Sequence, residues 1–99
     1  MYIILVYDIR VDEKGQKILN KVFKVCKRYL CHIQSSVFEG ELSEGQIVKL
    51  KSEIDKLIRK NCDSVIIFKS RNKKWLHKEF WGMEDNKVSN FLWYFVYVW

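Results

Sequence analysis

The chain has 99 residues, of which 48% are hydrophobic and 15% aromatic. This composition favours one folded domain over residues 1–99 and excludes disorder as its main state. The formal net charge is +6, from 18 Lys and Arg against 12 Asp and Glu. That balance favours a polyanionic partner, either nucleic acid or an acidic membrane surface. The 3 cysteines form no CxxC pair, which disfavours zinc and a disulfide framework and is compatible with a reducing cytoplasm.

Residues 2–9 are the first predicted strand, because they are mostly β-branched, aliphatic or aromatic. The segment has neither the basic flank nor the small-residue cleavage site of a signal peptide. Asp8 lies near its end, where a carboxylate is costly unless it is solvated, paired or bound to a cation. Two interpretations are open from the residues alone. Asp8 is a cation ligand, or it pairs with Arg10 or caps the next loop.

The spacing of apolar residues predicts a helix over residues 14–30, preceded by acids that suit a helix N-terminus. Basic residues form a row on another side of this helix: Lys14, Lys17, Lys21, Lys24 and Arg28. Like charges at this spacing repel one another and cost helix stability. Because no acid occurs over residues 14–38, we favour a bound nucleic-acid backbone over a merely solvated face. A second acid-free basic stretch, residues 69–78, adds candidate contacts at Arg71, Lys73 and Lys74.

The remaining elements follow in order. Residues 31–42 predict two short strands with a bend at 34–36, and Ser43 with Gln46 predicts a capping box that begins a second helix. The apolar face of that helix comprises Ile47, Leu50, Ile54, Leu57 and Ile58, and its mixed-charge outer face predicts a solvated surface. Residues 65–68, 75–82 and 88–99 are predicted strands. The apolar stretch 91–99 has half the length that a membrane-spanning helix needs, so we expect no membrane partner.

This order predicts an α+β fold, the ferredoxin-like βαββαβ sandwich, with an extra C-terminal strand. Helices in that fold cover only one face of the sheet. Both alternating sets of residues in the first strand are apolar, so the second face needs another cover. A second copy of the chain is the natural candidate, which predicts a sheet-to-sheet homodimer. Asp8 shares the parity of Ile4 and Val6, and we expect it on the partner side.

Four segments resemble a known family when they are taken together. They are Val6-Tyr7-Asp8-Ile9, the basic helix, residues 34–42 and residues 63–67. In this order they resemble the small CRISPR-associated adaptation protein family, the non-integrase partner in spacer acquisition. The resemblance runs over residues 2–70 and continues more weakly in residues 80–82 and 90–92. The combination of Ser-Val-Phe-Glu-Gly with Tyr-Asp at the end of the first strand is its most specific part.

The resemblance implies a ferredoxin-like homodimer in which residues 88–99 pair with the partner's sheet. It implies a divalent cation, Mg²⁺, held between the two copies of Asp8. Magnesium accepts one or two carboxylates together with water and phosphate oxygens, which suits one aspartate per chain. Ser36 and Phe38 match positions close to the family's active site. Ser36 could bond a phosphate, Phe38 is more often a core residue than a stacking platform, and Arg10 could contact the scissile phosphate.

Three functions stay open. The first is a metal-dependent endonuclease that cuts single-stranded RNA or duplex DNA. The second, which we rank first as the cellular role, is a scaffold for duplex DNA between two dimers of the CRISPR spacer integrase in antiviral defence. The third is a toxin of the same fold that cuts messenger RNA. We expect a cytoplasmic protein in each case.

Overall fold

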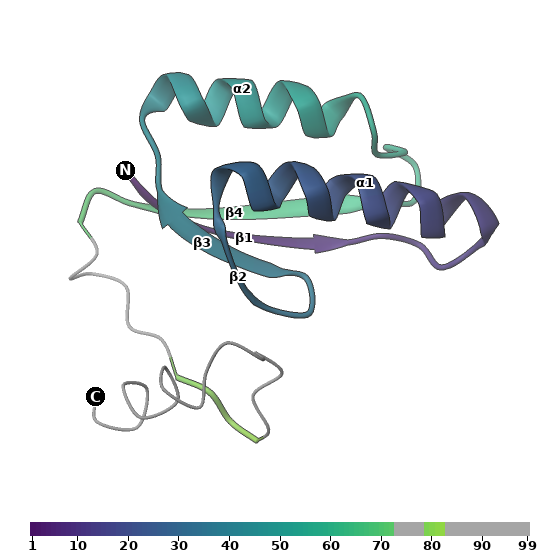
Figure 1. The fold of residues 1–99 in the computed structure, drawn as a ribbon, viewed down its shortest axis with the longest axis horizontal. Coiled ribbons are helices and arrows are strands. Elements are labelled where there is room, and N and C mark those ends of the chain that lie inside the picture. Colours follow the sequence, from purple (N-terminus) through teal and green to yellow (C-terminus); the bar gives the residue numbers. More distant parts are fainter. Residues whose placement is uncertain (73–78, 83–99) are drawn as a thin grey trace.

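The computed structural model describes residues 1–72 and 79–82, and residues 73–78 and 83–99 lie outside the described part (Figure 1). The elements are β1 (Tyr2–Asp8), α1 (Glu13–Tyr29), β2 (Cys31–Gln34), β3 (Val37–Glu41), α2 (Glu44–Asp55) and β4 (Ser64–Ser70). This is the α+β order that the sequence predicts. The two short strands expected within residues 31–42 are both present, as β2 and β3.

The strands form one sheet in the order β2-β3-β1-β4, with every neighbouring pair antiparallel. β1 lies inside the sheet, where Leu5 is opposite Phe38 of β3 and Ile67 of β4. Both helices lie on the same face of the sheet, which makes two layers (Figure 1). Within the described residues no helix is long and apolar enough to cross a membrane.

The core lies between the helices and the sheet. Ile3, Leu5 and Tyr7 of β1 point into it and are at most 4% exposed. They pack with Val22 of α1 and Leu50 of α2, both fully buried. Burial of apolar surface is the main force that holds such layers together, and it fixes which residues of β1 face the helices.

The other face of the sheet is apolar and open within the described residues. Ile66 and Phe68 of β4 are each 53% exposed, and they lie opposite Val6 and Ile4 of β1. Asp8 has the same parity as Ile4 and Val6 along β1, and its side chain is exposed. The prediction that Asp8 lies on the face away from the helices is therefore confirmed. We call this surface the open face.

The start of α2 agrees with the sequence prediction, whereas its end does not. Ser43 caps α2, and both hydrogen bonds of its capping box with Gln46 are present, as predicted. The helix ends at Asp55, however, so Leu57 and Ile58 follow it instead of lying on its apolar face. Both side chains still pack against the core, which explains why their spacing resembled a continuation of the helix.

Of the two strands predicted near the C-terminus, one is wrong in its described part and the other stays untested. Residues 79–82 are described and form no strand, so that part of the strand predicted over residues 75–82 is wrong. The predicted strand over residues 88–99 lies outside the described residues, as do Lys73 and Lys74 of the second basic stretch. Arg71 is described and its side chain is exposed.

Candidate functional site

Asp8 differs from the other aspartates of the described residues. Each of the others has an ion pair with a basic side chain: Asp12 and Asp63 with Arg59, and Asp55 with Lys51. Asp8 has no side-chain hydrogen bond or ion pair within residues 1–72 and 79–82, so it does not pair with Arg10. Its carboxylate remains available to a cation from outside the chain.

Two serines lie near the end of β1, one on each side. Ser64 of β4 is opposite Asp8 in the strand register, and its side chain is exposed. On the other side, the N–H of Tyr7 donates to the carbonyl of Ser36 at 3.2 Å, which brings the turn between β2 and β3 beside β1. Ser36 is thus bonded to the residue before Asp8, and its role in the site stays a prediction. The sequence did not single out Ser64 as a candidate, because only the register of β1 with β4 places it opposite Asp8.

The structure places the predicted site residues Arg10 and Phe38 in different surroundings. The side chain of Arg10 is exposed and has no hydrogen bond or ion pair among the described residues, so it is free to contact a phosphate. Phe38 is 0% exposed and packs with Tyr7 and Phe23 in the core. Because Phe38 lies on the helix-facing side of β3, its side chain cannot reach a substrate on the open face. Its proposed place in the site is corrected to a core role on β3, beside β1.

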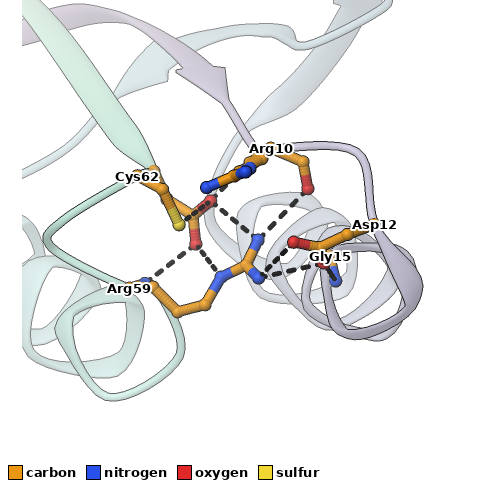
Figure 2. A network of polar contacts seen from close by, with 6 residues as sticks. Arg10, Asp12, Gly15, Arg59 and Cys62 are labelled. Atoms are coloured by element: carbon orange, nitrogen blue, oxygen red, sulfur yellow. Dashed lines mark hydrogen bonds and ion pairs between the residues drawn. The ribbon is translucent and has the colours of Figure 1, made fainter.

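A polar network holds the backbone just after Asp8, and Figure 2 shows how Arg59 lies at its centre. The guanidinium of Arg59 donates to Asp12 at 2.9 Å, to Asp63 at 3.0 and 3.1 Å, and to the carbonyl of Arg10 at 3.1 Å. Asp63 also accepts from the backbone N–H of Arg10 at 3.0 Å. The loop after β1 is thus bonded to α1 and to the start of β4.

The charges of this network are strongly coupled. Hydrogen bonds from Arg59 hold the pKa of the Asp63 carboxyl well below its usual range, and Asp63 in turn raises the pKa of Arg59. The backbone N–H of Gly15, followed by Arg59, lowers the pKa of Asp12. Sequence patterns assigned Arg59 to a solvated helix face. The available signal was its spacing of four residues before Asp63, which suits an ion pair.

Only some side chains of the basic row on α1 are without an ion pair among the described residues. The side chains of Lys14, Lys17, Lys21 and Lys24 are exposed and have no ion pair among the described residues. Arg28 is instead ion-paired with Glu53 of α2 at 2.5 Å, and the hydroxyl of Tyr29 donates to the same carboxylate. Glu53 offsets part of the charge of Arg28, and the expected contact of Arg28 with phosphate stays a prediction. We call the four unpaired lysines the lysine row.

The described residues of one chain contain one carboxylate that suits a metal ion and no larger cluster of metal ligands around it. No group of three or more His, Cys, Asp or Glu side chains within residues 1–72 and 79–82 could hold a metal ion. Asp8 nevertheless fits as one ligand of a hard divalent cation, because its carboxylate is exposed and unpaired. Magnesium commonly takes only one or two carboxylates, with water and phosphate as the other ligands.

Comparison with known proteins identifies the family. The family model described as CRISPR associated protein Cas2 matches residues 1–78. The chain belongs to the CRISPR-associated protein Cas2 family. It is 58% identical over 92 residues to the "CRISPR-associated endoribonuclease Cas2" of Fusobacterium nucleatum subsp. nucleatum, covering 93% of this chain and 87% of that protein.

Solved Cas2 structures agree with the fold. A crystal structure titled "cas2" matches with a TM-score of 0.76 at 35% identity, covering 90% of this chain and 94% of that one. The crystal structure of Streptococcus pyogenes Cas2 at pH 6.5 matches with a TM-score of 0.69 at 29% identity, covering 76% of this chain and 90% of that one. The family resemblance predicted from the sequence is confirmed.

Proposed function

We propose that this Cas2 protein is a divalent-metal-dependent endonuclease, with Asp8 as its metal ligand. The observation that carries the proposal is the exposed, unpaired carboxylate of Asp8 at the end of β1. The Fusobacterium relative is named an endoribonuclease, so single-stranded RNA is the first substrate to test, and duplex DNA is the second.

The residues around Asp8 have separate roles in this proposal. A bound Mg²⁺ supplies a water of lowered pKa and stabilises charge that develops on the phosphate. Asp8 holds that ion with one carboxylate. The exposed guanidinium of Arg10 binds a phosphate oxygen, as arginine does with charge-assisted hydrogen bonds. Ser36 and Ser64, near the end of β1, orient the sugar–phosphate backbone through their hydroxyls.

The second carboxylate comes from a second copy of the chain. The exposed Ile66 and Phe68 form an apolar surface with Ile4 and Val6, and a contiguous patch of this kind favours an interface. A twofold axis through this open face presents the same residues from both copies, including Asp8. The strand order β2-β3-β1-β4 and the two helices on one face support the ferredoxin-like fold for each protomer.

The lysine row supports a second role, as a scaffold for duplex DNA in spacer acquisition. Lys14, Lys17, Lys21 and Lys24 are free of ion pairs among the described residues, so their charges are available to phosphates. Such contacts give affinity and orientation without reading sequence. The spacer integrase is the protein partner of this role.

Cleavage is tested with Asp8→Asn in highly purified protein. Loss of a metal that contributes several kcal/mol to the transition state lowers the rate by at least about 100-fold. The assay measures cleavage of single-stranded RNA and duplex DNA with Mg²⁺ and with a chelator, and light scattering checks that the dimer mass is unchanged. Asp55→Asn is the control, because Asp55 is paired with Lys51 on α2. Full activity of Asp8→Asn would show that Asp8 is not the metal ligand.

The scaffold role is tested with Lys17→Glu/Lys21→Glu. We expect weaker binding of duplex DNA and a smaller dependence of the binding constant on salt concentration, because fewer counterions are released. Lys49→Glu/Lys51→Glu makes the same change in net charge on α2 and should bind nearly as the wild type does. Equal losses from both pairs would indicate that only overall charge matters. Asp8→Asn should leave binding intact, which separates this role from cleavage.

A further inference from the structure

Arg59 joins three segments that are far apart in the sequence. Its guanidinium bonds to both carboxylate oxygens of Asp12, to both of Asp63 and to the carbonyl of Arg10. Its own backbone N–H donates to Asp63 at 2.8 Å. All of these bonds lie around the loop that follows β1, as Figure 2 shows. We call this group the Arg59 clamp.

The clamp holds both strands on which the site is built. Arg10 lies in the loop two residues after the end of β1 at Asp8, and its N–H and its carbonyl are both bonded within the clamp. Asp63 immediately precedes Ser64, which is opposite Asp8 in the register. Motion of either backbone near Asp8 would therefore lengthen hydrogen bonds to Arg59 or Asp63.

The packing around the clamp leaves little free space. Asp12 caps α1 by accepting from the N–H of Gly15 at 2.6 Å. A Cβ added at Gly15 would lie 1.9 Å from the carbonyl oxygen of Arg10 and 3.1 Å from Nη2 of Arg59. The side chain of Asp63 is 0% exposed and that of Arg59 is 22% exposed. The loop after Asp8 is thus fixed by close contact as well as by charge.

We propose that Arg59 is a positioning residue for Asp8: it fixes the end of β1 so that the carboxylate is held ready for a divalent cation. The inference rests on the metal-dependent function proposed above and adds to it a residue that does not touch the metal. Groups that orient metal ligands typically change metal affinity or activity by about 10–100-fold when they are removed.

The chemistry of arginine explains why this residue type is needed. Its guanidinium presents five donors in a rigid plane, and the clamp uses Nε, Nη1 and Nη2 at the same time. A lysine keeps the charge but has one compact donor group on a flexible chain. Arg59→Lys therefore retains the ion pair with one aspartate and loses the simultaneous hold on Arg10, Asp12 and Asp63.

The test uses Mn²⁺ as a paramagnetic probe and the full chain in its natural oligomeric state. Mn²⁺ broadens the NMR signals of residues close to it, so the amide signals of Asp8 and Ser64 report binding without any cleavage. We expect the Mn²⁺ concentration at half broadening to rise about tenfold in Arg59→Met and less in Arg59→Lys. Asp12→Asn, which removes one partner of the clamp, should shift the midpoint in the same direction.

Glu53→Gln is the matched control. It removes an ion pair between Arg28 and Glu53, which joins α1 to α2 and involves no residue of the loop after β1. Its Mn²⁺ midpoint should equal that of the wild type at a temperature well below the melting transition of every variant. An unchanged midpoint in folded Arg59→Lys and Asp12→Asn, or an equal shift in Glu53→Gln, would overturn the positioning role alone. No selective broadening in the wild type would overturn the metal site and the positioning role together.

Discussion

Gly15→Ala should destabilise this protein, although alanine is normally favoured over glycine in a helix by about 1 kcal/mol. The added Cβ would lie 1.9 Å from the carbonyl oxygen of Arg10, whereas real Cβ atoms essentially never approach another atom closer than 3.0 Å. The contact must therefore open by at least 1.1 Å, the difference between those distances. The obstructing atom belongs to the backbone, and that carbonyl also accepts a hydrogen bond from Arg59, so it cannot simply rotate away.

The size of the effect follows from two opposing terms. Overpacking of a well-packed site typically costs about 1–3 kcal/mol, and the close approach to a bonded backbone atom places Gly15→Ala near the upper value. After the helix preference of about 1 kcal/mol is subtracted, the net loss is about 2 kcal/mol. In a domain of this size that loss lowers the melting temperature by about 8–16 °C.

Gly45→Ala is the matched control for this experiment. Gly45 also lies in the first turn of a helix, but its added Cβ would meet only Ser43 Oγ at 3.9 Å, an ordinary contact. We expect Gly45→Ala to be as stable as the wild type or slightly more stable. Circular dichroism during heating, at one fixed protein concentration, measures both variants. Equal stability of the two variants would refute the close packing of the loop after β1 against α1.

Three further predictions test other parts of the molecule. The pKa of the Asp63 carboxyl is lower in the folded than in the unfolded protein, so its stabilising effect is complete above the unfolded pKa of about 4 and is lost as the pH falls. The urea concentration at the unfolding midpoint should therefore drop from pH 6 to pH 3, and this drop should be smaller in Asp63→Asn. Phe38→Ala removes a 0% exposed core side chain and should cost about 3–5 kcal/mol in urea unfolding. Phe68→Glu should yield monomers in analytical ultracentrifugation, whereas Val48→Glu, at an exposed apolar residue of α2, should not; a dimeric Phe68→Glu would exclude the open face as the interface.

The parts of the fold that depend on local patterns could be predicted from the sequence. The capping box of Ser43 and Gln46 requires only four consecutive residues, and it begins α2 where predicted. Alternation along β1 placed Asp8 on the open face, because side chains in a strand point to opposite faces in turn. The end of α2 was missed because Leu57 and Ile58 are apolar and pack against the core without being helical.

The parts of the site that depend on distant contacts could not be predicted. Arg28 belongs to the basic row by its spacing, but the packing of α1 against α2 places Glu53 beside it. Arg59 resembles any basic residue on a polar helix face until the loop after β1 is folded against it. Phe38 is close to the site in sequence, yet the pleat of β3 turns its side chain into the core. For Arg28 and Arg59 the missing information was which groups meet across 25 or more residues of chain.

The pattern of pairing explains why Asp8 differs from its neighbours. Asp12 and Asp63 are both ion-paired with Arg59. Arg59 therefore offsets part of their negative charge within the fold, whereas Asp8 has no ion pair among the described residues. A carboxylate that needed only a fold-stabilising partner could have used Arg10, which is exposed and two residues away. Arg59 instead holds the backbone next to Asp8 through several hydrogen bonds, while the carboxylate of Asp8 has no partner among the described residues. A fixed backbone with a free carboxylate is the combination that an external cation requires.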